Sequence, residues 1–316
     1  MAENTKIQWC DHTFNTHWGC TKISDGCSNC YAENMGNRFG VKWGAGEPRK
    51  TMSENYWKQP LKWNKRAGEN NVRERVFCSS MADVFDNEAP EGVREKLWSL
   101  IKATPHLDWL IVTKRIGNVK NMLPEDWGDG YPNVWLLITV VNQIEADRDI
   151  PKLIDTPAAI RGLSIEPMLG YIDLTYIQFD AFTTMDVLSG NGLSTISVCQ
   201  SAPNAFCDPI DWVIVGGESG SNARPMHPAW AKSLQDQCKL AGVAFFFKQQ
   251  GEWALEQVKA GGDLGGDMRK GIVQQVCLDR ENDGHFRKGD VHMRKVGKEV
   301  SGRLLNGVEY NEYPNT

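Results

Sequence analysis

The stretch Trp109-Leu-Ile-Val112, followed at once by Thr113-Lys114-Arg115, contains the pattern that decides the fold. Four consecutive apolar residues indicate a strand that is buried on both faces, as in a parallel sheet covered by helices. The change to polar residues marks the carboxyl end of that strand. The same pattern returns in five further stretches, at residues 76–79, 134–138, 160–163, 212–215 and 243–247.

Amphipathic segments separate these apolar stretches. Residues 89–104 place Val93, Leu97, Leu100 and Ile101 at helical spacing. Alternating strands and helices predict an α/β fold, a closed or partial (β/α) barrel of six to seven parallel strands. Further helices are predicted at residues 31–39, directly before Leu123, at 144–155 and at 228–241, the last with Gly242 as its stop signal.

The chain is expected to divide near residue 258. Residues 1–258 would form the barrel, interrupted at about 176–208 by an insertion rich in Ser, Thr, Gly and Asn. Residues 40–70 hold many Gly, Pro, Lys and Trp residues and are expected to form a long excursion over one mouth of the fold. Residues 259–316 would form a Gly-rich linker and a small β-rich appendix.

The appendix is predicted from short alternating segments. The linker is placed at residues 261–266, and strands are expected around 272–278 and 303–310. Asn306-Gly307 predicts a hairpin turn, because both residues readily adopt positive φ.

Each predicted strand releases polar residues at its carboxyl end, where barrels of this kind carry their active site. Candidates at these ends include Ser80, Asp83, Glu166 and Glu218. The alternative is that these residues merely begin solvated loops. Because six consecutive strands end in this way, a site at this face is favoured.

Composition limits the classes of protein. The 316 residues carry a net charge of −5, which creates no global field that attracts nucleic acid. No apolar run approaches the roughly 20 residues of a membrane helix, and the first residues lack a secretory signal pattern. Nine cysteines without an export signal indicate a reducing cytosol, where metal or redox chemistry is commoner than disulfides.

Three cysteines, Cys20, Cys27 and Cys30, fall within eleven residues. Thiolates this close commonly hold a metal or an iron–sulfur cluster. One reading is structural zinc, which takes four ligands. The other is a four-iron cluster with one iron left open for a small ligand, which needs a pocket such as the strand ends supply. Spacing alone does not choose between them; the candidates for a fourth zinc ligand are Cys10, His12 and His17.

The cysteine region, Asn15-Thr-His-Trp-Gly-Cys20 with Gly26-Cys27-Ser-Asn-Cys30-Tyr31-Ala32, resembles the signature of a phage-encoded three-cysteine, radical S-adenosylmethionine-like family. A more distant similarity reaches the spore photoproduct lyase branch of that superfamily. The spacing departs from the superfamily pattern, with six and then two residues between the cysteines in place of three and two. The resemblance continues through Leu163-Ser-Ile-Glu166-Pro167, Trp212-Val-Ile-Val-Gly-Gly-Glu218, Phe247-Lys248-Gln249 and Gly302-Arg-Leu-Leu-Asn-Gly307.

The resemblance implies a radical S-adenosylmethionine enzyme in which Cys20, Cys27 and Cys30 ligate a [4Fe–4S] cluster. It implies S-adenosyl-L-methionine as cofactor, a flavodoxin- or ferredoxin-type one-electron reductant, no membrane, and a cytoplasmic location in the host of a phage. The phage setting favours modification, rearrangement or lyase chemistry on a nucleobase or hypermodified DNA. The rival reading is a zinc-stabilised, non-catalytic protein that binds nucleic acid or a partner.

Within this scheme, strand-end residues receive roles from their chemistry. Gly216 and Gly217 let the backbone approach a ligand, and Glu218 would accept a hydrogen bond unless it is a solvated acid in a turn. Lys114 and Arg115 would pair with a carboxylate or phosphate unless they form a surface pair. The predicted catalytic residues are Lys114, Glu166, Glu218 and Lys248. The predicted cofactor-binding residues are Tyr31, Ser80, Asp83, Thr113, Thr139, Asn142, Gly216 and Gly217.

Other candidates have plainer readings. His227 is expected either to carry a proton or to cap the helix that follows it. Cys78 and Cys238 lie in apolar patterns and are expected in the core. Cys277 is expected to pack in the appendix, and Cys199 and Cys207 lie in the insertion without a partner motif.

Overall fold

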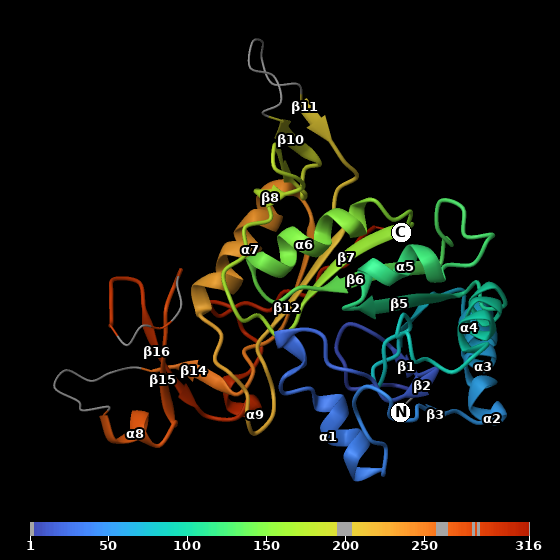
Figure 1. Cartoon of the computed structure of the whole chain (residues 1–316), viewed down its shortest axis with the longest axis horizontal. Coiled ribbons are helices and arrows are strands. Elements are labelled where there is room, and N and C mark those ends of the chain that lie inside the picture. The colour runs from blue at the N-terminus through green and yellow to red at the C-terminus, as the bar shows by residue number, and fades with distance from the viewer. Residues whose placement is uncertain (1–2, 195–203, 257–264, 280–281, 283–284, 316) are drawn as a thin grey trace. The chain divides into compact units, whose positions relative to one another are not determined.

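The computed structural model describes residues 3–194, 204–256, 265–279, 282 and 285–315 (Figure 1). Its main sheet has seven strands in the order β1-β4-β5-β6-β7-β12-β13. The first and last strands of that order are not neighbours, so the sheet of the described chain is open. The predicted α/β class is confirmed, in its partial-barrel form. The strands of this sheet are β1 (His12–Phe14), β4 (Glu74–Cys78), β5 (Leu107–Thr113), β6 (Val134–Thr139), β7 (Ile160–Ile165), β12 (Trp212–Gly216) and β13 (Ala244–Gln249).

The six predicted strands all form, and β4 to β7 pair in parallel with one another, as do β12 and β13. Cys78 lies opposite Ile111, Thr113 opposite Ile138, and Thr139 opposite Ser164. These registers align the carboxyl ends of β4 to β7 along one edge. Side chains such as Trp109 and Ile111 are fully buried, as expected for strands covered on both faces.

The predicted helices also form: α7 has the predicted bounds, and most of the others have shifted ends. The segment predicted at 89–104 becomes α4 (Val93–Lys102), because Pro90 belongs to the turn that precedes it. Gly242 ends α7 at a φ of +73°, as its stop signal predicted. The α-helices are α1 (Tyr31–Arg38), α2 (Glu54–Trp57), α3 (Gln59–Glu69), α4, α5 (Ile116–Met122), α6 (Gln143–Ile154), α7 (Pro228–Ala241), α8 (Gly265–Arg269) and α9 (Lys298–Ser301).

In the amino-terminal part, the sequence did not delimit every element. The segment at residues 12–18 divides into β1, which joins the main sheet, and β2 (His17–Trp18), which pairs with β3 (Lys50–Thr51). The excursion at 40–70 contains helices α2 and α3. In α3 one face is buried at Pro60, Trp63 and Ala67, which is amphipathic helical spacing among many polar residues.

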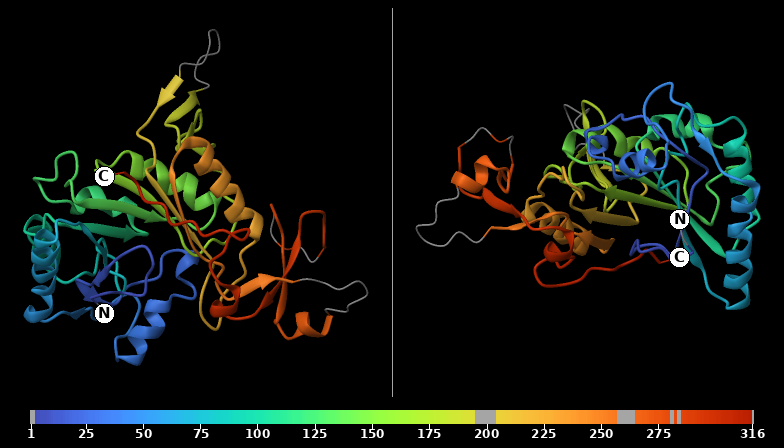
Figure 2. Two further views of the ribbon diagram at one scale, coloured as in Figure 1. Left: turned by 180° about the vertical axis from the view of Figure 1, so that it is seen from behind. Right: turned by 90° about the horizontal axis from the view of Figure 1, so that it is seen from below.

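The insertion at 176–208 forms its own antiparallel sheet in the order β11-β10-β9-β8. The appendix is a three-stranded sheet in the order β14-β16-β15, coloured orange to red in Figure 2. The expected strand at 303–310 is absent from the described residues, where Leu305 and Val308 form an isolated bridge around the predicted Asn306-Gly307 turn. The linker predicted at 261–266 lies largely outside the described residues. The small-sheet strands are β8 (Ile177–Gln178), β9 (Thr183–Asp186), β10 (Asn191–Ser194), β11 (Asn204–Phe206), β14 (Trp253–Leu255), β15 (Val273–Val276) and β16 (Val291–Lys295).

The chain divides into two compact units. The first comprises Met1–Thr139 and Asp149–Ser164, and the second comprises Val140–Arg148 and Ile165–Thr316. The boundary expected at residue 258 stays a prediction, although β14 precedes it and pairs with β16. In the described part of the chain, no helix is long and apolar enough to cross a membrane.

Plain packing roles are confirmed for several residues. Cys78 and Cys238 are fully buried, and Cys277 is buried in the appendix. His227 caps α7, since its Nδ1 accepts a hydrogen bond from the Ala229 amide at 3.0 Å and its Nε2 lies 2.9 Å from the Gly289 carbonyl. Both ring nitrogens are therefore engaged, which favours the cap over the proton carrier. Cys207 is half-buried, and Cys199 lies outside the described residues.

Candidate cysteine-loop site

The cysteine loop is fastened to the carboxyl end of β4. Gly19, at a φ of +110°, donates its amide to the Met81 carbonyl at 3.1 Å. The Tyr31 hydroxyl donates to the Ser80 carbonyl at 2.9 Å. The loop therefore lies at the strand edge where the sequence predicted a site.

Asn15, for which the sequence predicted no role, also contacts this turn at Ser80 and Met81. Its side chain is fully buried, accepts a hydrogen bond from the Met81 amide at 2.6 Å and donates to the Ser80 hydroxyl at 3.3 Å. The turn after β4 is thus determined by a residue that follows β1. Only the position of Asn15 just before the cysteine motif could have indicated this.

The three thiols lie along this loop, and each cysteine is half-buried. Cys27 ends a short 3₁₀ turn (Asp25–Cys27), and Cys30 is the residue before α1. Among the described residues, no three His, Cys, Asp or Glu side chains are close enough together to hold a metal ion. Ligation of a metal by the three thiols stays a prediction.

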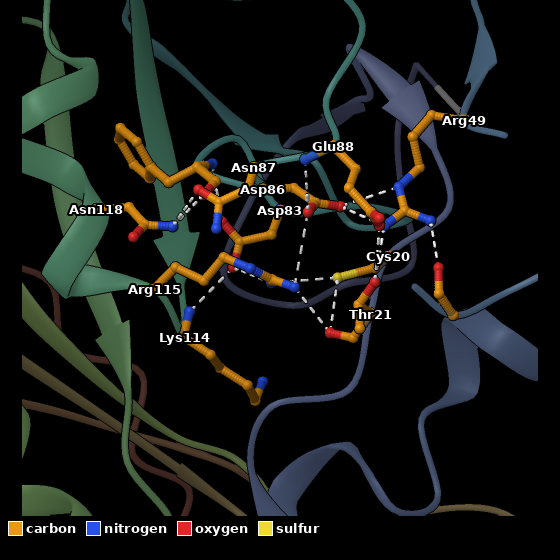
Figure 3. A network of polar contacts seen from close by, with 12 residues as sticks. Cys20, Thr21, Arg49, Asp83, Asp86, Asn87, Glu88, Lys114, Arg115 and Asn118 are labelled. Atoms are coloured by element: carbon orange, nitrogen blue, oxygen red, sulfur yellow. Dashed lines mark hydrogen bonds and ion pairs between the residues drawn. The ribbon is translucent and has the colours of Figure 1, made fainter. Parts of the chain in front are cut away.

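Arg115 connects the loop to the end of β5 (Figure 3). Its Nη1 donates to Cys20 Sγ at 3.3 Å and to Asp83 Oδ2 at 3.2 Å, and its Nη2 donates to the Thr21 carbonyl at 2.8 Å. The Arg115 and Asp83 side chains are each 7% exposed. The alternative that Arg115 belongs to a surface pair is therefore wrong, because its side chain is buried and pairs with the carboxylate of Asp83.

Asp83 organises the segment after β5. It accepts hydrogen bonds from the Thr113 hydroxyl at 2.8 Å and from the Lys114 amide at 3.1 Å, besides its pair with Arg115. The structure thus joins Asp83 and Thr113, which the sequence predicted as cofactor contacts. The Lys114 side chain points away from this network in Figure 3.

A second buried arginine, Arg49, holds the residue that follows Cys20. Its side chain is 2% exposed, pairs with Asp86, and donates from Nη2 to the Thr21 hydroxyl at 2.8 Å. Thr21 also donates to Glu88 at 3.1 Å. Sequence reasoning missed Arg49 because it lies in the supposed excursion, where no periodic pattern marks it.

Burial and charge set the ionisation of these groups. Burial raises the pKa of the Cys20 thiol to about 11, against the opposing effect of the Arg115 charge. Burial also works against the charge of Arg115, yet Asp83, Cys20 and Asp86 hold the pKa of its guanidinium above its ordinary value. Burial therefore disfavours the thiolate form of Cys20, and the Arg115 charge favours it.

His17 lies in β2, three residues before Cys20. Its Nδ1 is 2.9 Å from the Thr16 hydroxyl, and its buried Nε2 has no partner among the described residues. His12, another candidate fourth zinc ligand, is instead paired with Glu74 at 2.9 Å and stacked on Trp63. Of the two histidines, only His17 has a ring nitrogen without a hydrogen-bond partner among the described residues.

We expect His17 to make stability depend on pH. Burial lowers its pKa from 6.5 to about 4, with Asp86 opposing the shift. Between these values the unfolded chain binds more protons, so the contribution is complete above pH 6.5 and is lost as pH falls toward 4. The loss is about 3 kcal/mol. As pH falls from 6.5 to about 4, urea unfolding should show the free energy of unfolding of the wild type falling relative to that of His17→Phe. If the free energies of the two proteins changed in parallel with pH, His17 would not be the group responsible.

In the second unit the structure brings Glu166 and Lys248 together. Their carboxylate and ammonium groups lie 3.1 Å apart, and both side chains are partly exposed. An added Cβ at Gly216 would lie 2.6 Å from Glu166 Oε1. The backbone at Gly216 therefore lies close to the carboxylate of Glu166. Glu166 and Lys248 form an accessible ion pair at the carboxyl ends of β7 and β13.

Other predicted residues of that unit have partners within the protein. Glu218 is 6% exposed and accepts hydrogen bonds from Arg224 at its amide (2.7 Å), Nε (3.0 Å) and Nη2 (2.8 Å). An added Cβ at Gly217 would lie 2.1 Å from the Gln250 carbonyl oxygen. Asn142 caps α6 by accepting from the Glu145 amide at 3.0 Å. These contacts make Glu218 a paired buried acid and not a solvated one.

Thr139 lies in the first unit, at the end of β6, and is buried. Its register partner is Ser164 of β7. Its predicted contact with the cofactor stays a prediction.

The fold and this loop together define a class: an α/β partial-barrel protein with a three-cysteine loop fastened to the carboxyl ends of its strands. Within that class the chain belongs to the family described as "Protein of unknown function (DUF5131)", whose sequence model matches residues 4–314. No curated protein and no solved structure matches the chain.

Proposed function

We propose that this protein is a radical S-adenosylmethionine enzyme whose Cys20, Cys27 and Cys30 hold a [4Fe–4S] cluster. The observation that carries the proposal is the position of the three-thiol loop at the carboxyl ends of β4 and β5, with a buried guanidinium on the first sulfur. The set of donors suits the group, because iron–sulfur clusters are held by cysteine thiolates. When bound, such a cluster supplies the electron that cleaves S-adenosylmethionine and generates a 5′-deoxyadenosyl radical.

The residues around the cysteine loop fix its position. Tyr31 and Asn15 fix the turn at Ser80 and Met81, and Arg115 with Arg49 fixes Cys20 and Thr21. Such preorganisation holds a cofactor in a single orientation. Lys114 has a half-buried side chain beside this network and is the candidate there for an anionic group of the cofactor or substrate.

Substrate chemistry is proposed at the accessible Glu166–Lys248 pair. A carboxylate beside an ammonium group offers both an acceptor and a donor to a polar ring such as a nucleobase. We propose a nucleotide or modified DNA as substrate, in a modification, rearrangement or lyase reaction. The proposal includes a flavodoxin- or ferredoxin-type reductant and a cytoplasmic location, in the host if the chain is phage-encoded.

Metal content tests the proposal. Protein purified without oxygen is expected to be brown and to carry about four irons per chain. Iron and acid-labile sulfide are measured together with zinc on the same sample. Colourless protein holding one tight zinc and no iron would overturn the enzyme and support the zinc-stabilised alternative.

A further inference from the structure

A positive charge lies against the first of the three sulfurs. Arg115 Nη1 is 3.3 Å from Cys20 Sγ, although the two residues are 95 positions apart in the chain. The arginine side chain is 7% exposed, so water screens this contact little. An N–H group that donates to a ligand sulfur, and a charge beside it, both change how easily a cluster accepts an electron.

The same arginine fixes Cys20 in space. It donates to the Thr21 carbonyl while Arg49 donates to the Thr21 hydroxyl, so two buried guanidinium groups hold the residue that follows Cys20. The hydrogen bonds of Cys27 and Cys30 are different, because they run through the backbone within the loop and α1. Cys20 is thus the thiol whose sulfur accepts a hydrogen bond from a side chain at the end of β5.

We infer that Arg115 is a positioning residue that holds Cys20 in place to ligate the cluster and raises the reduction potential of the cluster. This inference rests on the proposed function. Reduction adds one electron, supplied by the external reductant, and therefore one negative charge near Cys20. The Arg115 charge and its N–H donor stabilise that added charge, because the attraction is strong where water is excluded.

The inference is tested in an Asp83→Asn background, because removing Arg115 alone would leave a buried carboxylate unpaired. The variants are Asp83→Asn, Asp83→Asn with Arg115→Gln, and Asp83→Asn with Arg115→Lys. Arg73→Gln is the matched control: it breaks an arginine–aspartate pair, with Asp108, at the amino ends of the strands. Each protein is purified without oxygen, its iron is counted, and its potential is measured by a dye-mediated spectroscopic titration.

We expect the glutamine variant to titrate at a more negative potential than Asp83→Asn, the lysine variant to recover part of the difference, and Arg73→Gln to match the wild type. Equal potentials in Asp83→Asn and its Arg115→Gln derivative, at full iron content, would overturn the inference. Loss of iron in the glutamine variant with retention in the lysine variant would support the positioning role. Failure of the proposed function looks different, since the wild type itself would then contain no iron.

Discussion

Replacing Cys27 with alanine is expected to abolish the reductive cleavage of S-adenosylmethionine to 5′-deoxyadenosine, down to the background without enzyme. The proposed cluster needs all three thiolates, and two cannot keep it bound to the chain. The fold should survive, because Cys27 is half-buried and its backbone, which the substitution leaves in place, forms the hydrogen bonds to Ser24 and Cys30. The measurement is 5′-deoxyadenosine formed with dithionite under anaerobic conditions.

A control substitution at another half-buried cysteine distinguishes the loss of a cluster ligand from the loss of any thiol. Cys207 is also half-buried but lies in the 176–208 insertion, so Cys207→Ala should retain both iron and cleavage. Circular dichroism of both variants checks that the fold is kept. Cleavage by Cys27→Ala at the wild-type rate would remove Cys27 from the ligand set and, with it, the support for a three-cysteine cluster.

Regular strands could be predicted because their burial is encoded locally. Residues such as Leu110 and Ile111 lie within uninterrupted apolar runs, which identify a covered parallel strand without any tertiary information. The bounds of strand β1 could not be predicted, since its three residues include a histidine and a threonine that are buried by neighbours far along the chain. Helix α3 escaped since Gly, Pro and Lys conceal the spacing of Trp63 and Ala67.

The candidate site was predicted as separate residues and not as an arrangement. The sequence indicated Cys20, Asp83 and Thr113 individually, because each lies in a motif or at the end of a strand. It could not indicate that Arg115 contacts Cys20, since the contact depends on the register between strands and on a long loop. The pairing of Glu218 with Arg224 likewise follows from a local turn that strand patterns do not describe.

Removing the carboxylate of Asp83 is expected to cause the largest loss of stability among the site variants. Asp83→Ala would leave the Arg115 charge buried beside Cys20 without its closest anion, and would remove the acceptor for Thr113 and the Lys114 amide. Breaking a buried ion pair by deleting one partner costs about 3–5 kcal/mol. Urea unfolding of the metal-free chain, followed by tryptophan fluorescence, measures this loss.

Two variants show whether the cost comes from the buried charge. Asp83→Asn keeps an oxygen acceptor for Thr113, so it should lose less stability than Asp83→Ala. Asp155→Ala breaks an exposed pair with Lys120 and should leave the unfolding midpoint unchanged, because exposed pairs contribute little. If Asp83→Ala unfolded at the same urea concentration as Asp155→Ala, the Asp83–Arg115 pair would not be what holds the cysteine loop to the strand ends.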